Sequence, residues 1–145
     1  MALPAFRKDG TLPPGRRPAE WDEFCNRFGW NPRRQELLAG LKAALGNLKE
    51  AGCRRVFVDG SFVTAKEFPE DFDACWDLQG VNPKRLDPVL LVFGPGRAAQ
   101  KAKFLGELVP AIAMANSRDT FIEFFQRDRA GKHKGIVVLD LRRLP

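Results

Sequence analysis

VFVDGSFVTAKEFPEDFDACWD, residues 56–77, is the stretch on which a prediction of the fold depends. The apolar run VFV is typical of a buried strand and leads directly into Asp59-Gly60-Ser61. Farther along, DFDACWDL (71–78) alternates in character, as a second strand would. Because strand side chains repeat every two residues, Asp71 and Asp73 are expected on the same face. The stretch therefore predicts two strands joined through a Gly-Ser turn.

Two interpretations of this stretch are open. Asp-Gly favours the type I′ turn of a tight hairpin, in which the later aspartates would be solvent-facing strand residues. Alternatively, Gly60-Ser61 opens a short helix whose free N–H groups and serine hydroxyl hold phosphate oxygens. In that case Asp71 and Asp73 are oxygen ligands of the kind that Mg²⁺ accepts beside a triphosphate. Two such ions would activate an attacking hydroxyl and stabilise the leaving pyrophosphate.

The distribution of charge favours a cation site. The chain has 145 residues and a formal net charge of +6, yet residues 56–77 contain six acidic residues and one lysine. Residues 81–145 are basic, with twelve Lys and Arg against six Asp and Glu. An acidic focus within a basic chain suits a cation bound beside a polyanion such as a triphosphate or RNA.

The segments around this stretch predict a mixed fold. Asn31-Pro32 is a helix-start signal, and leucines recur on one stripe of the helix that follows, up to about Ala51. The Pro- and Arg-rich residues 1–18 are expected to form an extended arm, and 19–145 a single domain. Further elements are expected as helices over 19–29, 97–108 and 118–129, and as strands over 53–60, 108–115 and 135–141. We therefore expect an α/β (α+β) fold, a small mixed sheet of three to five strands flanked by helices.

Several other classes of protein are not expected. The first residues lack the apolar core of a signal peptide, and no run approaches the roughly 18 apolar residues of a membrane span, so we expect a cytoplasmic protein. The three cysteines have no zinc-ligand spacing and are expected as reduced thiols. His133, in the basic turn 132–134, is the one histidine and offers little basis for a histidine-dependent hydrolase.

Gly60-Ser61 followed nine residues later by Asp71-Phe72-Asp73 resembles the signature of the DNA polymerase β-like nucleotidyltransferase superfamily. Longer blocks resemble a family of small bacterial and phage proteins that is described as nucleotidyltransferase-like. These blocks are LPPG, RFGWNPRRQELLAGL, AGCRRVFVDGSFVTAKEFPEDFDACWD, FIEFFQRDRAG and KHKGIVVLDL. The resemblance covers most of the chain.

The resemblance implies a role for each matched residue. Gly60 and Ser61 would hold the β- and γ-phosphates of a nucleoside triphosphate, and Asp71 and Asp73 would ligate Mg²⁺, with two ions expected. The superfamily adds a third catalytic carboxylate. The candidates are Glu107 and, on the last predicted strand, Asp140, which we include in the predicted catalytic set. Lys101, with Arg97 one helical turn before it, would receive the triphosphate.

By the same resemblance, the expected activity is Mg²⁺-dependent transfer of a nucleoside monophosphate from an NTP to a hydroxyl of protein or RNA. Small stand-alone members of the superfamily act in toxin–antitoxin or phage-defence pairs, which implies a partner protein or tRNA as acceptor. Two alternatives remain. One is a catalytically inactive interaction module of the same fold, similar to an antitoxin. The other is a basic nucleic-acid-binding protein in which the net charge matters and the aspartates do not.

Overall fold

The computed structural model describes residues 3–111 and 134–145, which form one mixed β-sheet with helices on one face. The strand order is β1-β5-β2-β3-β4, with β1 parallel to β5 and β3 parallel to β4, and β2 antiparallel to both of its neighbours. The strands are β1 (Gly15–Ala19), β2 (Arg55–Asp59), β3 (Phe72–Trp76), β4 (Gly106–Pro110) and β5 (Gly135–Asp140). This arrangement confirms the predicted small mixed sheet.

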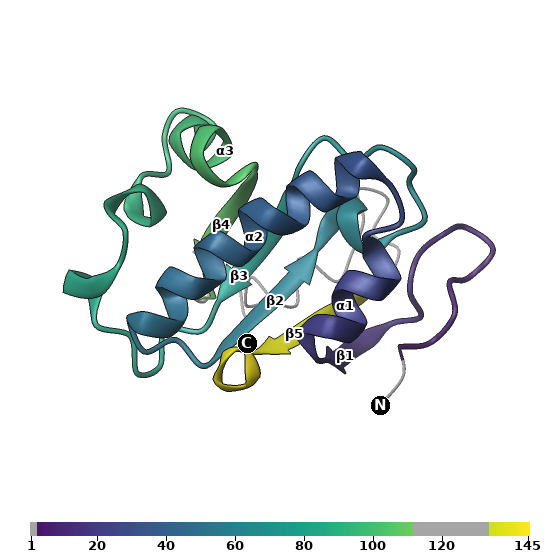
Figure 1. Ribbon diagram of the computed structural model, residues 1–145, viewed down its shortest axis with the longest axis horizontal. Helices are drawn as coiled ribbons and strands as arrows, with labels where there is room; N and C mark the ends of the chain where they lie inside the picture. The colour runs from purple at the N-terminus through teal and green to yellow at the C-terminus, as the bar shows by residue number, and fades with distance from the viewer. Residues whose placement is uncertain (1–2, 112–133) are drawn as a thin grey trace, which may run out of the picture.

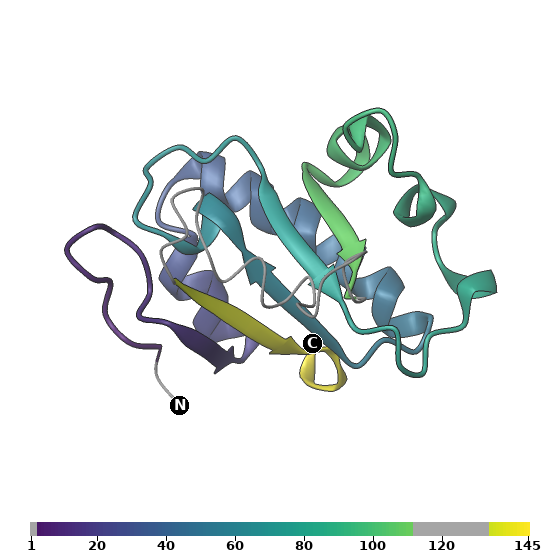
Figure 2. The ribbon, with the colours of Figure 1, turned by 180° about the vertical axis from the view of Figure 1, so that it is seen from behind.

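Three α-helices lie in the described part of the chain, namely α1 (Trp21–Phe28), α2 (Pro32–Glu50) and α3 (Ala98–Phe104). In Figure 1, α1 and α2 lie in front of the sheet, and in Figure 2 the strands face the viewer. Both views place α3 beside β4, at the edge of the sheet. One face of the sheet therefore carries the α1–α2 layer, and the other is free of these helices.

The local signals for α1 and α2 are confirmed. Asn31 caps α2 by accepting a hydrogen bond from the Arg34 backbone N–H, and Pro32 is its first residue. The predicted leucine stripe of α2 is buried against the sheet. It belongs to one large apolar core that also holds alternate residues of β2, β3 and β5. Burial of this stripe is what fixes the helical layer on the sheet.

The residues predicted as an extended arm, 1–18, are integrated into the domain from Leu3 onward. Residues 7–11 turn back on themselves through hydrogen bonds between Arg7 and both Gly10 and Thr11, and β1 then pairs with β5 along its whole length. Leu3 and Leu12 are buried in the main core. The Pro- and Arg-rich composition gave no signal for this pairing, because β1 exposes every second residue and is held through its backbone.

The helix predicted over 97–108 ends earlier, and this changes where Glu107 lies. Leu105 adopts the left-handed conformation (φ 67°) and its N–H bonds to the Lys101 carbonyl, so α3 stops at Phe104. Gly106 then packs directly on the ring of Phe72, where a Cβ would collide. Glu107 consequently belongs to a strand. That strand lies at the sheet edge, a position that tolerates Pro110, which has no backbone N–H to donate.

Several 3₁₀ turns connect these elements: η1 (Gly60–Val63), η2 (Pro83–Arg85), η3 (Pro88–Leu91) and η4 (Leu141–Arg143). None of the helices in the described residues is sufficiently long and apolar to cross a membrane. The helix predicted over 118–129 and the turn residues 132–133 lie outside the described residues.

Candidate metal and phosphate site

Three carboxylates meet at one end of the sheet, on the face opposite α1 and α2. In the parallel pair β3–β4, Asp73 lies directly beside Glu107, and Asp71 precedes Asp73 by two positions on the same side. Each of the three offers an oxygen, and these oxygens all lie within 4.8 Å of one another. We call Asp71, Asp73 and Glu107 the carboxylate cluster. Its donor set, three partly buried carboxylates, suits Mg²⁺ or Mn²⁺.

Two basic side chains from the α3 region pair with this cluster. Lys101 Nζ lies 3.3 Å from Glu107 Oε1 and 3.8 Å from Asp71 Oδ2, and Arg97 Nε lies 3.4 Å from Glu107 Oε1. Arg97 is the residue before α3 and has a left-handed backbone (φ 56°). Lys101 is one turn farther along, so the predicted placement of both on one side is confirmed. The pairs are about half exposed or less, which leaves the lysine free to rearrange.

The proximity of the acids shifts their pKa values. Burial, the shared interaction with Glu107 and the charge of Asp71 together raise the pKa of Asp73 to about 7. Burial and Glu107 also raise the pKa of Asp71, although Lys101 opposes this. Burial would raise the pKa of Glu107, but the interaction with Asp73 and the charges of Arg97 and Lys101 outweigh it and lower that pKa. Ionisation of all three acids at once is therefore unfavourable in the absence of a bound cation.

The Gly60-Ser61 turn lies against the cluster. Residues 60–63 form η1, so the tight hairpin turn does not occur, although β2 and β3 are antiparallel. Gly60 has φ +74°, and a Cβ on it would collide with Asp73 Oδ2. Glycine is required here both for the backbone conformation and for the close approach of the aspartate. The turn and the second Asp of the Asp-x-Asp motif are thus adjacent in space, as the site requires.

A buried arginine holds the segment after this turn in place. Arg34 of α2 has no exposed surface, and its guanidinium donates to the carbonyls of Phe28, Phe62, Thr64 and Lys66 at 2.7–3.1 Å. Its charge faces no carboxylate among these partners, and burial lowers its pKa to about 10. The guanidinium also stacks 3.7 Å from the Trp30 ring. Arg34 therefore acts as a clamp between the helical layer and the loop that leads to Asp71.

The hollow at the cluster is small. It has a volume of about 40 Å³ and is lined by Asp73, Ala74, Arg97, Glu107 and Val109. This accommodates one water or a cation but not a nucleotide. A larger cavity of about 370 Å³ lies at the other end of the sheet, lined by residues that include Arg55, Asp140 and Arg143. A triphosphate at the cluster would therefore lie across open surface.

Of the predicted site residues, Gly60, Ser61, Asp71, Asp73 and Lys101 come together. Asp140 does not join them: on β5 it pairs with Arg55, the first residue of β2, whereas Asp73 pairs with the last. At about 3.3 Å per residue the two ends of β2 are about 13 Å apart.

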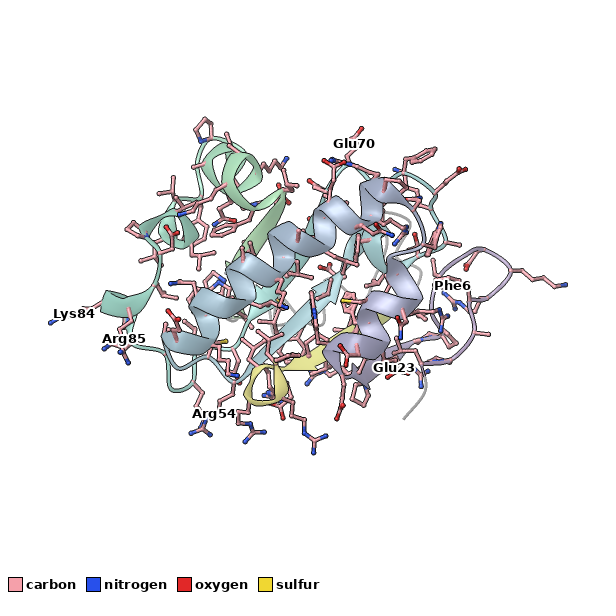
Figure 3. All side chains as sticks on the ribbon, viewed as in Figure 1. Phe6, Glu23, Arg54, Glu70, Lys84 and Arg85 are labelled. Atoms are coloured by element: carbon pink, nitrogen blue, oxygen red, sulfur yellow. The ribbon has the colours of Figure 1, made fainter. Side chains whose placement is uncertain are left out.

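The two ends of the sheet are marked in Figure 3. Glu70 labels the cluster end, because it precedes Asp71. Arg54 labels the opposite end, where its carbonyl accepts from Leu141 N–H. The Asp140 carboxylate is held there by Arg142 at 3.0 Å, and that interaction lowers its pKa. The prediction of Asp140 as the third carboxylate is therefore corrected to Glu107.

Two residues of this region were missed by sequence reasoning. Arg34 had a signal, because it stands on the buried stripe of α2, three residues before Leu37. The sequence also contained a signal for Asp59: it follows Phe57 by two positions on a strand, so its side chain lies on the same face of the sheet as that of Phe57. Its burial, with 4% of its surface exposed, depends on neighbouring strands that local sequence does not reveal.

Comparison with known proteins gives the family of this chain. No significant match was found among curated proteins or among solved structures. Residues 4–140 match a protein family whose description is "Family of unknown function (DUF6932)". Because the match spans nearly the whole chain, from before β1 to the end of β5, this protein belongs to that family.

Proposed function

We propose that this protein is a Mg²⁺-dependent nucleotidyltransferase that moves a nucleoside monophosphate from an NTP to a hydroxyl of a protein or an RNA. The observation that carries the proposal is the meeting of Asp71, Asp73 and Glu107 within 4.8 Å beside the Gly60-Ser61 turn. A carboxylate cluster and a glycine turn at the same place suit a divalent cation and the phosphates that it binds.

The chain's own residues have distinct tasks in this proposal. The carboxylate cluster would hold Mg²⁺, which supplies charge stabilisation to the reacting phosphate oxygens. Gly60 leaves room for Asp73 to approach the turn, and the N–H groups of the turn and the Ser61 hydroxyl would donate to phosphate. In the reaction, the acceptor oxygen would bond to the α-phosphorus while its proton passes to a carboxylate of the cluster, the bond to the bridging oxygen breaks and pyrophosphate leaves.

Lys101 would exchange partners when the ligand binds. It bridges Asp71 and Glu107, the position that a divalent cation would take, and its side chain is 46% exposed. A compact dication interacts more strongly with these acids than a single ammonium does. The released ammonium would then lie within reach of the triphosphate. Lys101→Met should therefore raise the affinity for the metal alone and lower the affinity for Mg²⁺–NTP.

The wider role follows from analogy with small nucleotidyltransferases and belongs to the same proposal. The acceptor would be a partner protein or tRNA, as in toxin–antitoxin or phage-defence pairs, and the reaction would take place in the cytoplasm. The net charge of +6 supports an acidic or polyanionic partner.

The first test is calorimetric titration of ATP, GTP, CTP and UTP, each with Mg²⁺, into wild type and Asp71→Ala/Asp73→Ala. We expect one nucleotide or more to bind wild type only when Mg²⁺ is present, and the double variant not to bind. Asp77→Asn is a matched control, since this aspartate follows the far end of β3 and pairs with Arg55 at 3.2 Å. If folded wild type binds no nucleotide, the proposal fails and the interaction module becomes the better hypothesis.

A further inference from the structure

Asp59, the last residue of β2, is a buried acid without an evident structural task. Only 4% of its surface is exposed, and its Oδ1 atom is completely buried with no hydrogen-bond partner among residues 3–111 and 134–145. An unpaired polar atom in this position lowers the stability of the fold, and does so more strongly when it is charged. A buried carboxylate of this kind calls for an explanation in terms of a ligand.

The ordinary explanation, helix capping, does not apply. Asp59 stands at the N-cap position of η1, yet its side chain makes no capping hydrogen bond. Equivalent aspartates elsewhere in the chain do cap: Asp87 accepts from Val89 N–H, and Asp140 accepts from Arg142 N–H. Asp59 therefore stands where it could cap the following turn, but its carboxylate does not accept a hydrogen bond from that turn.

The side chain of Asp59 faces the carboxylate cluster. In the antiparallel pair β2–β3 it lies directly opposite Asp73, so both point to the same face of the sheet. Side chains at such positions begin about 4.5–5.5 Å apart at Cβ. Burial and the negative charge of Asp73 raise the pKa of Asp59 well above its ordinary value, and the charge of Lys134 opposes the shift. Two acids thus meet across these two strands, and ionisation of both is unfavourable without a cation.

Among the described residues, Lys134 is the one cation whose charge acts on Asp59. Asp59 lies beside the carboxylate cluster but is not among the acids whose oxygens lie within 4.8 Å of one another. The cations that interact with these four acids among the described residues are Arg33, Arg97, Lys101 and Lys134. Arg97 and Lys101 contact Glu107 and Asp71, on the side of Asp73 away from β2. Neither of these two contacts the Asp59 carboxylate.

We infer that Asp59 is a fourth carboxylate of this site, and that Asp59 and Asp73 together form a second divalent-cation position beside the carboxylate cluster. The inference rests on the proposed cation site of the preceding section. Asp73 lies between Asp59 and Glu107 in the strand order, so it is the shared ligand of the two positions. A carboxylate can bridge two ions at the separation of about 3.5–4 Å that two-metal sites show.

The test is the number of Mn²⁺ ions bound by the chelator-treated protein without nucleotide, measured from the electron paramagnetic resonance signal of free Mn²⁺. Wild type should bind two ions, and Asp59→Asn, which keeps the shape of the side chain, should bind one. Affinity for the second ion should fall at least tenfold. Asp77→Asn should still bind two. One ion bound by wild type, or two bound with equal affinity by Asp59→Asn, would overturn the inference.

A thermal melt separates this role from a structural one. If Asp59 is retained for a cation, Asp59→Asn relieves like-charge repulsion and raises the melting temperature of the metal-free protein. A lowered melting temperature together with unchanged Mn²⁺ binding would show a structural role and reject the inference. Should the amide not be accommodated, Asp59→Ser removes the charge without adding volume and gives the same ion count.

Failure of this inference can be told apart from failure of the proposed function. Two Mn²⁺ ions bound by a protein that binds no nucleotide would support the role of Asp59 and reject nucleotidyl transfer. Nucleotide binding that needs Asp71 and Asp73, with an ion count that does not change in Asp59→Asn, would support the proposed function and reject the role of Asp59.

Discussion

Replacement of Asp73 by asparagine should stabilise the metal-free protein at neutral and alkaline pH. Asp73 lies between two other carboxylates, Asp59 on β2 and Glu107 on β4. Its folded-state pKa is raised to about 7 from an ordinary value of 3.8. The folded chain therefore holds a proton that the unfolded chain has released between about pH 4 and pH 7. Stability falls as the pH rises through that window and is level above it.

The magnitude follows from the size of this shift. Each pKa unit corresponds to about 1.36 kcal/mol, so about three units amount to about 4 kcal/mol. The lowered pKa of Glu107 offsets part of this, because the interaction between the two groups shifts their pKa values in opposite directions. We expect Asp73→Asn to exceed wild type by about 2–4 kcal/mol in unfolding free energy at pH 8, and to differ little at pH 4.

Urea unfolding with a metal chelator at pH 4.5, 6 and 8 measures this directly. With a slope of about 2 kcal/mol per molar urea, the gain at pH 8 is about 1–2 M in the midpoint. Asp77→Asn is the control, since it loses a partly exposed ion pair with Arg55 that is worth about 1 kcal/mol at most. An Asp73→Asn protein less stable than wild type at pH 8 would refute the argument that like charges meet at this position.

Three further variants test the parts of the site. Glu107→Gln keeps the side-chain shape but removes one ligand charge, so Mn²⁺ affinity should fall at least about tenfold in calorimetric titration; unchanged affinity would place the third ligand elsewhere. Gly60→Ala forces a side chain into φ +74° and against Asp73, and should lose about 1–2 kcal/mol of stability and weaken Mn²⁺ binding, whereas wild-type values for both would contradict the close approach. Arg34→Met leaves four carbonyls without their donor and should lose about 3–5 kcal/mol in urea unfolding. The more exposed neighbour Arg33 donates to the carbonyls of Pro69 and Glu70 and pairs with Glu36, so Arg33→Met should lose less than Arg34→Met, and equal losses would argue against the clamp.

Local chemistry was sufficient to predict the elements that carry their own signals. The start of α2 follows from Asn31 and Pro32, and its buried stripe from the spacing of the leucines. Asp71 and Asp73 lie on the same face of the sheet because side chains alternate along a strand, and this alternation can be read from the sequence alone. In each case the determining contacts lie within a few residues in the sequence, which is the range over which pattern reasoning works.

The third carboxylate could not be chosen by the same reasoning. Its identity depends on where α3 ends, and α3 ends where Gly106 packs on Phe72, far away in the sequence. That contact starts β4 early enough for Glu107 to lie beside Asp73. Asp140 looked equivalent because it also stands at a strand end, but β5 runs antiparallel to β2 and carries it away from the site. Sheet register, which is non-local, decided between the two acids.

The acids at the two ends of the sheet have different partners, and this contrast supports the cluster end as the place of the proposed function. At the far end, Asp140 pairs with Arg142 and Asp77 with Arg55, so each carboxylate is neutralised by an arginine of its own. At the other end Asp59 is buried opposite a second acid, and the carboxylate cluster shares the basic residues of α3. Arrangements that lower stability persist where a ligand reverses their cost. A cation would do so at the cluster end and would gain little at the other. The acidic focus of a basic chain is therefore explained by its position in the fold, because sheet register gathers these charges where a single divalent ion can neutralise several of them at once.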